Sequence, residues 1–391
     1  MKNHIATGLE CLIKEPPEYL KGKRLGLLSN PASVDYHFNH ASKLVNRLFP
    51  GQLKALFSPQ HGFYAEKQDN MIESCHFTEP QFNIPVFSLY NDTRVPTREM
   101  FDKIDILLVD IQDVGTRVYT FIYTISFCLE VAKKLNKKVV ILDRPNPIGG
   151  TVTEGNILKK KYASFVGRFP VPMRHGLTVG EISQFFNREF NIGCDLFVIP
   201  MKGWKRKMYW QDTGLYWVPP SPNLPTPQSC LVYPGQVIFE GTNISEGRGT
   251  TLPFEQFGAP FIDTEKIKAK ADKMIKGAYL RPVSFEPLSG KWKGNVCKGF
   301  QIHITSKKDF KPYFSSLLLM QLIIKYHEKD FKFKNPPYEY EFEKMPIDLI
   351  LGSKKLRSQL AGLQDLTLLS DQWQKDLDNF NLLSGKYHLY D

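Results

Sequence analysis

The chain has 391 residues and a net charge of +11, with 42% hydrophobic and 23% charged residues. This length suggests two or three domains with a sizeable core, and the composition is ordinary for a globular protein. The positive charge is spread thinly and no nucleic-acid motif occurs, so a nucleic-acid partner is not expected.

Several other classes of protein are disfavoured. No apolar run approaches the ~20 residues that span a bilayer, so membrane insertion is not expected. The N-terminus carries Glu10 and no long apolar segment, which favours a cytoplasmic protein, or a periplasmic or secreted one if a leader was removed. The six cysteines are scattered, which favours buried free thiols. Neither a Cys-x-x-Cys pair nor a glycine-rich nucleotide motif occurs, so we expect no metal and no cofactor.

Short apolar runs alternate with helical patterns in the first half of the chain. We expect strands at 25–28, 53–57, 85–89, 106–109, 138–142 and 195–199. Helices are expected at 40–48, 116–135 and 178–190. This alternation predicts an α/β protein with a mostly parallel, doubly wound sheet.

A proline-rich stretch predicts the boundary between two domains. Residues 217–227 contain five prolines, which force an extended backbone. We therefore predict domains at 1–228 and 229–391. In the second domain we expect a strand at 295–305, helices at 314–326 and 366–380, and a loop or docking arm at 330–343.

Polar side chains gather immediately after the expected strands. Asp110 and Asp113 follow the strand at 106–109, and Arg117 comes shortly after them. The residues in this position after the other strands are Asn30, Gln60, His61, Glu66, Tyr90, Asp143, Arg144 and Asn146. Ligands of open parallel sheets bind beyond the carboxyl ends of the strands, so these clusters predict one site. The alternative is that Asp110 and Asp113 only cap a turn and a helix.

A second candidate segment lies at 237–251, after the proline-rich stretch. It contains Glu240, Asn243, Glu246 and Arg248 among glycines, which permit tight turns and close approach to a ligand. A flexible surface loop is the alternative interpretation.

Seven motifs occur in one order along the chain. They are Asn30-Pro31, Ser58-Pro-Gln-His-Gly-Phe63, Asp110-Ile-Gln-Asp-Val-Gly-Thr-Arg117, Asp143-Arg-Pro-Asn-Pro147, Arg174-His-Gly176, Pro220-Ser-Pro-Asn-Leu-Pro225 and Glu240-Gly-Thr-Asn-Ile-Ser-Glu-Gly-Arg-Gly249. Together they resemble the exo-β-N-acetylmuramidases of bacterial cell-wall recycling, a family formerly catalogued as a domain of unknown function. The resemblance implies a Rossmann-like N-terminal domain, a smaller C-terminal α/β domain and an active cleft between them. It also implies release of N-acetylmuramic acid (MurNAc) from the non-reducing end of peptidoglycan fragments such as its disaccharide with N-acetylglucosamine (MurNAc-GlcNAc).

One position departs from that family. Many members read Pro-Glu-His-Gly where this chain has Gln60, and a glutamine cannot transfer a proton. We therefore expect Glu66 to act as the general acid, oriented by His61 and Gln60. Asp110 and Asp113 are expected to stay ionised, because glycoside hydrolysis pairs a protonated carboxyl with a second group.

The remaining candidates are expected to bind substrate. A guanidinium suits the lactyl carboxylate of MurNAc, which nominates Arg248, Arg144 and Arg117. The other expected contacts are Asn30, Asn146, Glu240, Asn243 and Glu246. A structural pair of Arg144 with Asp143 is an alternative for that arginine. Two other functions stay open at this point: a non-catalytic muropeptide-binding protein, which Gln60 makes conceivable, and an enzyme acting on a phosphorylated sugar.

Overall fold

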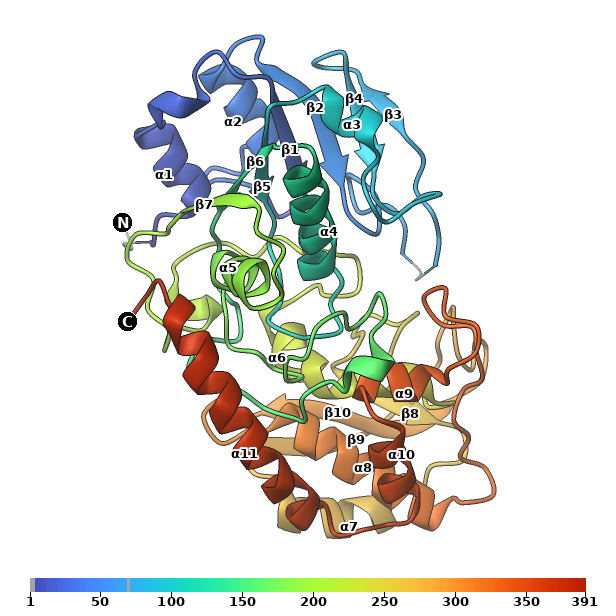
Figure 1. Cartoon of the computed structure of the whole chain (residues 1–391). Coiled ribbons are helices and arrows are strands. Elements are labelled where there is room, and N and C mark those ends of the chain that lie inside the picture. The colour runs from blue at the N-terminus through green and yellow to red at the C-terminus, as the bar shows by residue number, and fades with distance from the viewer. Residues whose placement is uncertain (1–3, 69–70) are drawn as a thin grey trace.

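A seven-stranded sheet organises the first part of the chain in the computed structural model, which describes residues 4–68 and 71–391 (Figure 1). In spatial order its strands are β3 (Phe77–Glu79), β4 (Ile84–Ser88), β2 (Leu53–Ser58), β1 (Leu25–Ser29), β5 (Ile106–Asp110), β6 (Lys138–Leu142) and β7 (Asp195–Ile199). Neighbouring strands are parallel except β3 and β4. The predicted mostly parallel sheet is confirmed, with each expected strand within one residue of its predicted bounds.

Helices cover both faces of this sheet. On one face α1 (Gly8–Lys14) and α2 (Ala41–Leu48) pack against Ile106 and Leu108 of β5. On the other face α3 (Arg98–Asp102), α4 (Phe121–Lys134) and α5 (Val179–Glu189) pack against Leu107 and Val109. Successive residues of a buried strand point to opposite faces, which explains the unbroken apolar run. The strand order reverses between β1 and β5, where a doubly wound sheet opens a crevice.

The helix expected at 116–135 begins later, at Phe121. Before it, the chain forms an isolated bridge between Thr116 and Arg174, and Arg117 N donates to Met173 O at 2.8 Å. Gly115 precedes this bridge with φ +73°, a conformation that glycine adopts without strain. The connection then turns, with Tyr119 N donating to Thr116 O at 3.0 Å, and ends with Thr120 at the N-terminus of α4.

The second part of the chain is built on a smaller, antiparallel sheet. Its strands, in spatial order, are β8 (Gln256–Ala259), β10 (Cys297–Ile304) and β9 (Ala278–Phe285). Its helices are α6 (Pro227–Gln236), α7 (Thr264–Met274), α8 (Pro312–Tyr326), α9 (Pro346–Leu351), α10 (Lys354–Ala361) and α11 (Leu366–Ser384). The expected strand at 295–305 and the helices at 314–326 and 366–380 are confirmed as β10, α8 and α11. The tract 330–343 is a loop, as expected, with isolated bridges at Phe333 and Tyr338.

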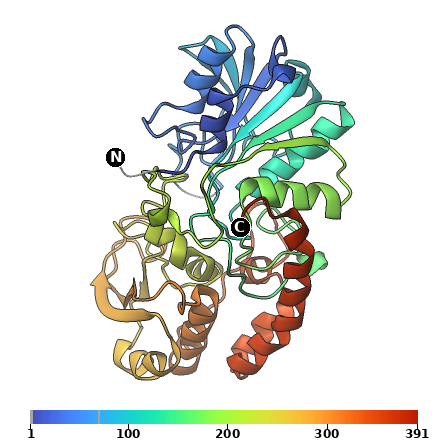
Figure 2. The same ribbon diagram turned by 90° about the vertical axis from the view of Figure 1, so that its left-hand side faces the viewer.

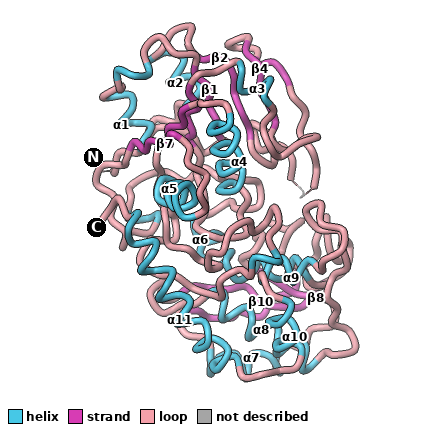
Figure 3. The backbone as a smooth tube through the Cα atoms, viewed as in Figure 1, coloured by secondary structure: helices cyan, strands magenta, loops and turns pink. Residues whose placement is uncertain are grey.

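The two sheets lie in separate lobes (Figure 2), and loops occupy most of the region between them (Figure 3). One continuous apolar core nevertheless extends from α4 and α5 into α6, α8 and α9. Helix α11 crosses from the smaller lobe to α5, where Phe380 contacts Phe185 edge-on. All six cysteines are free thiols, and only Cys75 is exposed. Within the described residues, no helix is both long and apolar enough to cross a membrane.

Candidate active site

A pocket lies where loops beyond the carboxyl ends of the large sheet face loops of the smaller lobe. We call it the junction pocket. Its polar lining residues are Gln60 and His61 after β2, Tyr119 and Thr120 before α4, Ser221, Asn223, Tyr233 on α6, Glu240, Arg248, Tyr338 and Glu339. Of the residues predicted from the sequence, the structure brings Gln60, His61, Glu240 and Arg248 together here.

Gln60 contacts a carboxylate that the sequence analysis did not single out. Its Nε2 donates to Oε1 of Glu339 at 3.1 Å, and its Oε1 accepts from Oγ1 of Thr120 at 2.8 Å. The hydroxyl of Tyr90 donates to Oε2 of Glu339 at 2.6 Å. Glu339 is only 5% exposed, and this burial raises its pKa, although the bonds from Tyr90 and Gln60 oppose the rise. This carboxyl group is thus held toward its neutral form.

Glu240 is held differently, by a cation. Arg248 donates from one terminal nitrogen to Oε1 of Glu240 at 2.8 Å, and its Nε lies 3.4 Å from Oε1 of Glu246. Tyr338 donates its hydroxyl to Oε2 of Glu240 at 2.6 Å, and Lys291 pairs with Glu246 at 2.7 Å. Burial alone would lower the pKa of Arg248, but the two carboxylates outweigh it and raise the pKa. The segment 237–251 is therefore an ion-paired wall of the pocket.

His61 is neutral in this setting. Its Nδ1 lies 2.8 Å from the carbonyl oxygen of Lys67, which can only accept, so Nδ1 carries the proton and Nε2 is an acceptor. Burial lowers the pKa of His61 to about 4. Its backbone has φ +79°, an unusual conformation for a residue with a side chain. His61 can thus orient a substrate hydroxyl or amide but is not charged near neutral pH.

Glu66, the expected general acid, does not line the junction pocket. Its side chain is exposed and its carboxylate lies over Gly62. The neighbouring Tyr64 is exposed as well, so it does not bury the Glu66 carboxylate. Its predicted role stays untested, and its position gives that role no support.

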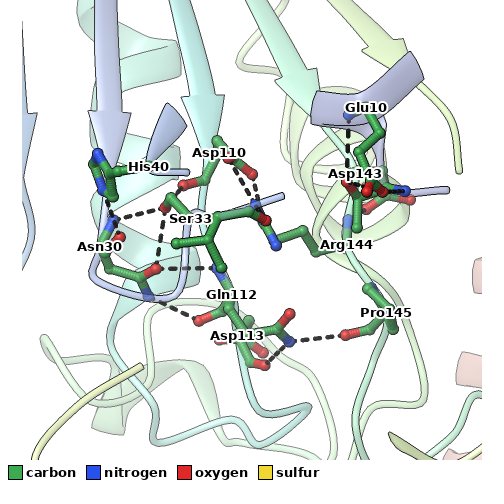
Figure 4. Close-up of polar contacts among 12 residues, drawn as sticks. Glu10, Asn30, Ser33, His40, Asp110, Gln112, Asp113, Asp143, Arg144 and Pro145 are labelled. Carbon is green, nitrogen blue, oxygen red and sulfur yellow. Dashed lines mark hydrogen bonds and ion pairs between the residues drawn. The ribbon is translucent and has the colours of Figure 1, made fainter. Parts of the chain in front are cut away.

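Asn30, Asp110 and Arg144 form a second polar cluster beside the strand-order reversal, separate from the junction pocket (Figure 4). Arg144 donates from Nε and a terminal nitrogen to both oxygens of Asp110, and both side chains are buried. Asn30 donates from Nδ2 to the carbonyl of Gln112 at 3.0 Å. The alternative pairing of Arg144 with Asp143 is wrong, because the Asp143 side chain accepts from the backbone nitrogen of Arg144 instead. These contacts fix the turns after β1, β5 and β6.

Three other residues that were expected to contact the substrate form hydrogen bonds with backbone groups instead. Arg117 is fully buried and donates to the carbonyls of Asn156 at 2.8 Å, Val171 at 3.0 Å and Ile350 at 2.9 Å. Asn146 donates to the carbonyl of Leu177 at 3.0 Å and accepts from Ile148 N at 3.1 Å. Asn243 donates to Asp330 O at 2.8 Å and accepts from Lys332 N at 2.9 Å. These residues hold loops together and do not line the pocket.

Asp113 lies buried behind the pocket wall. Its Oδ2 accepts from the backbone nitrogen of Gly115 at 2.7 Å and lies 3.8 Å from Nε2 of His175. Burial raises the pKa of Asp113 to about 7, whereas burial lowers the pKa of His175 to about 3. We expected an ionised Asp113; burial instead raises its pKa to about 7 and favours its protonated form.

Glu339 and Tyr338 were not expected at the site, because the tract 330–343 was predicted to be a loop or docking arm. A signal was present in Tyr338-Glu-Tyr-Glu341, which alternates aromatic and acidic residues beside two prolines. The structure turns this tract inward, with Glu339 and Tyr340 at φ +47° and +64°. Arg94 covers the ring of Tyr340 at 3.6 Å and fixes the loop against the larger lobe.

Comparisons with known proteins extend over the whole chain. The model of the N-terminal domain of exo-β-N-acetylmuramidase NamZ matches residues 25–228, and that of the C-terminal domain matches 231–390. The chain is similar to peptidoglycan β-N-acetylmuramidase NamZ of Bacillus subtilis (strain 168), with 39% identity over 390 residues, 100% of this chain and 92% of that protein. Crystal structures of two DUF1343 family proteins from Bacteroides fragilis NCTC 9343 are also similar. One has a TM-score of 0.90 and 34% identity with both chains fully covered, and the other has 0.77 and 30%, covering 100% and 99%.

Proposed function

Because the chain belongs to the exo-β-N-acetylmuramidase family, we propose that it is a glycoside hydrolase that releases MurNAc from the non-reducing end of peptidoglycan fragments such as MurNAc-GlcNAc. The observation that supports this most is the junction pocket itself. It places two buried carboxyl groups, Glu240 and Glu339, in unlike surroundings within one pocket.

Unlike carboxyl groups suit glycoside hydrolysis. The reaction needs one group that gives a proton to the departing oxygen and others that stabilise positive charge at the anomeric carbon. Glu240, which accepts from Arg248 and Tyr338, is our candidate for a group that stabilises this charge. A 2-acetamido group on the substrate can itself act as the nucleophile, in which case an ionised carboxylate orients it.

Arg248 is our candidate for the lactyl carboxylate of MurNAc. It lines the pocket, its side chain is 16% exposed, and its guanidinium lies 5.0 Å from the ring centre of Phe254. The ion pairs to Glu240 and Glu246 fix its orientation before substrate binds. A preorganised guanidinium loses little entropy when it pairs with a carboxylate.

Purified protein should release free MurNAc and GlcNAc from MurNAc-GlcNAc, measured by chromatography of the products. The reversed disaccharide, with GlcNAc at the non-reducing end, should remain intact because it presents no lactyl group to the pocket. Equal cleavage of both disaccharides would contradict the proposed specificity. Tight binding of MurNAc-GlcNAc without cleavage would identify a binding protein instead.

A further inference from the structure

Glu339 lies within hydrogen-bond distance of the side chain at position 60. Gln60 and Glu339 are 279 residues apart in the chain, yet their side chains meet at 3.1 Å inside the junction pocket. Position 60 of the larger lobe thus carries a glutamine in place of a glutamate, and this glutamine directly contacts a carboxyl group of the smaller lobe.

The surroundings separate Glu339 from the other acidic residues of the site. Within the described residues its side-chain hydrogen bonds come from two neutral groups, the Gln60 amide and the Tyr90 hydroxyl. Glu240 instead pairs with a guanidinium, and Glu246 pairs with Lys291 away from the pocket lining. Arg94 lies near enough to Glu339 to oppose a raised pKa, but burial outweighs it, whereas the guanidinium of Arg248 contacts Glu240 directly.

The backbone around Glu339 is strained, which is typical of functional sites. Glu339 and Tyr340 both have positive φ, as do His61 and Phe254, which line the same pocket. Such conformations are unfavourable for residues with a side chain and persist only where the surroundings enforce them. The Arg94–Tyr340 stacking and the Tyr90 hydrogen bond are contacts that hold the Glu339 turn inward.

We propose that Glu339 is the general acid of this enzyme and that Gln60 positions it. This inference rests on the proposed function above. Glu339 gives its proton to the glycosidic oxygen as the bond from that oxygen to the anomeric carbon breaks, so GlcNAc leaves as a neutral alcohol. The oxygen of a water molecule bonds to the anomeric carbon as a hydroxyl group. The other proton of that water returns to Glu339. The sum is disaccharide plus water giving two sugars.

Gln60 is a positioning residue in this scheme. Its amide bridges Thr120 and Glu339, so it connects the N-terminus of α4 with the loop of the smaller lobe. A glutamate at this position would place two carboxyl groups within hydrogen-bond distance, where one must retain a proton.

The test uses two substrates that differ in their need for an acid. MurNAc-GlcNAc has a sugar alcohol as its leaving group, whereas 4-nitrophenyl β-N-acetylmuramide releases a nitrophenolate that needs little protonation. Glu339→Gln should lower kcat on the disaccharide at least ~10²-fold and lower it far less on the nitrophenyl substrate. Glu343→Gln, an exposed change on the same loop, is the matched control and should behave like the unaltered protein.

A second variant tests the assignment should Glu339→Gln fail to fold. Tyr90→Phe removes a hydrogen bond that favours ionised Glu339, so the alkaline limb of the kcat/KM profile should move up by about one pH unit. An unmoved limb overturns the assignment.

Three other results also overturn the assignment. Glu339→Gln could lose activity equally on both substrates, which would mark a structural role. It could retain activity while Glu66→Gln is inactive, which would return the acid role to Glu66. If the unaltered protein cleaves neither substrate, the proposed function fails and this inference fails with it, a result distinguishable from both of the others.

Discussion

At the scale of single residues, Arg248 is our proposed contact for the lactyl carboxylate of MurNAc. A charge-assisted hydrogen bond contributes roughly 1.5–3 kcal/mol, so Arg248→Ala should raise KM for MurNAc-GlcNAc about ten- to a hundredfold. The inhibition constant of the analogue disaccharide without the lactyl ether, measured as a competitor of MurNAc-GlcNAc cleavage, should rise much less. Arg248→Lys keeps the charge but loses the planar fork and should lie between the two.

Steady-state kinetics with MurNAc-GlcNAc as substrate and the analogue as competitor checks this prediction. If KM and the inhibition constant rise equally, Arg248 serves mainly to hold Glu240, whose carboxylate it contacts at 2.8 Å.

At the scale of elements, the connection from β5 to α4 buries Asp113 and makes stability depend on pH. The pKa of Asp113 is raised from 3.8 to about 7, so its protonated form is favoured in the fold. Stability from this group is therefore fully present below about pH 4 and is lost as pH rises through 7, by up to ~4 kcal/mol. Asp113→Asn can still accept from Gly115 N and should remove this pH dependence.

Urea unfolding between about pH 4 and pH 8 measures the effect. The unfolding free energy of Asp113→Asn should exceed that of the unaltered protein progressively as pH rises. Asp102→Asn, an exposed change at the end of α3, is the control. Parallel pH profiles for all three proteins would show that Asp113 does not titrate in this range.

Elements of the larger sheet were predictable because their signals are local. A buried parallel strand such as 106–109 reads as an apolar run, and polar residues follow it where the chain leaves the sheet. The start of α4 was not predictable, since the bridge from Thr116 to Arg174 is a tertiary contact. Only the residues of the site that stand in sequence motifs were predictable, because the others reach it through tertiary contacts. Gln60 and Arg248 stand in motifs, but Glu339 reaches the pocket through a loop whose inward turn depends on Arg94 and Tyr90.

At the scale of the whole molecule, Arg117 joins the two lobes. It donates to the carbonyls of Asn156 and Val171, in the segment between β6 and α5, and to Ile350 O on α9, all of them buried. Arg117→Met would leave the carbonyls of Asn156 and Ile350 without this donor, at about 1–3 kcal/mol each, while Val171 O would keep Leu158 N at 3.3 Å. We expect it to lower the unfolding free energy by at least ~3 kcal/mol, compared with less than 1 kcal/mol for the exposed change Arg188→Met.

Thermal unfolding followed by circular dichroism tests this expectation. A loss no larger than that of Arg188→Met would show that water replaces the guanidinium and that the lobes do not depend on it.

The division into domains at 228 and 229 stays our proposal. It falls in the first turn of α6 and agrees with the bounds of the two family models, 25–228 and 231–390. The core that continues through α6 indicates that neither part is independent of the other.

The contact between Gln60 and Glu339 has a consequence for how such proteins can be recombined. The two positions lie on opposite sides of the proposed domain boundary, so a chimera that exchanges the smaller lobe between relatives inherits them from different parents. A relative with glutamate at position 60 would then confront Glu339 with a second carboxyl, and one without an acid at position 339 would leave Gln60 facing no proton donor. Although residues 60 and 339 are far apart in the sequence, a functional chimera must therefore take both from the same parent.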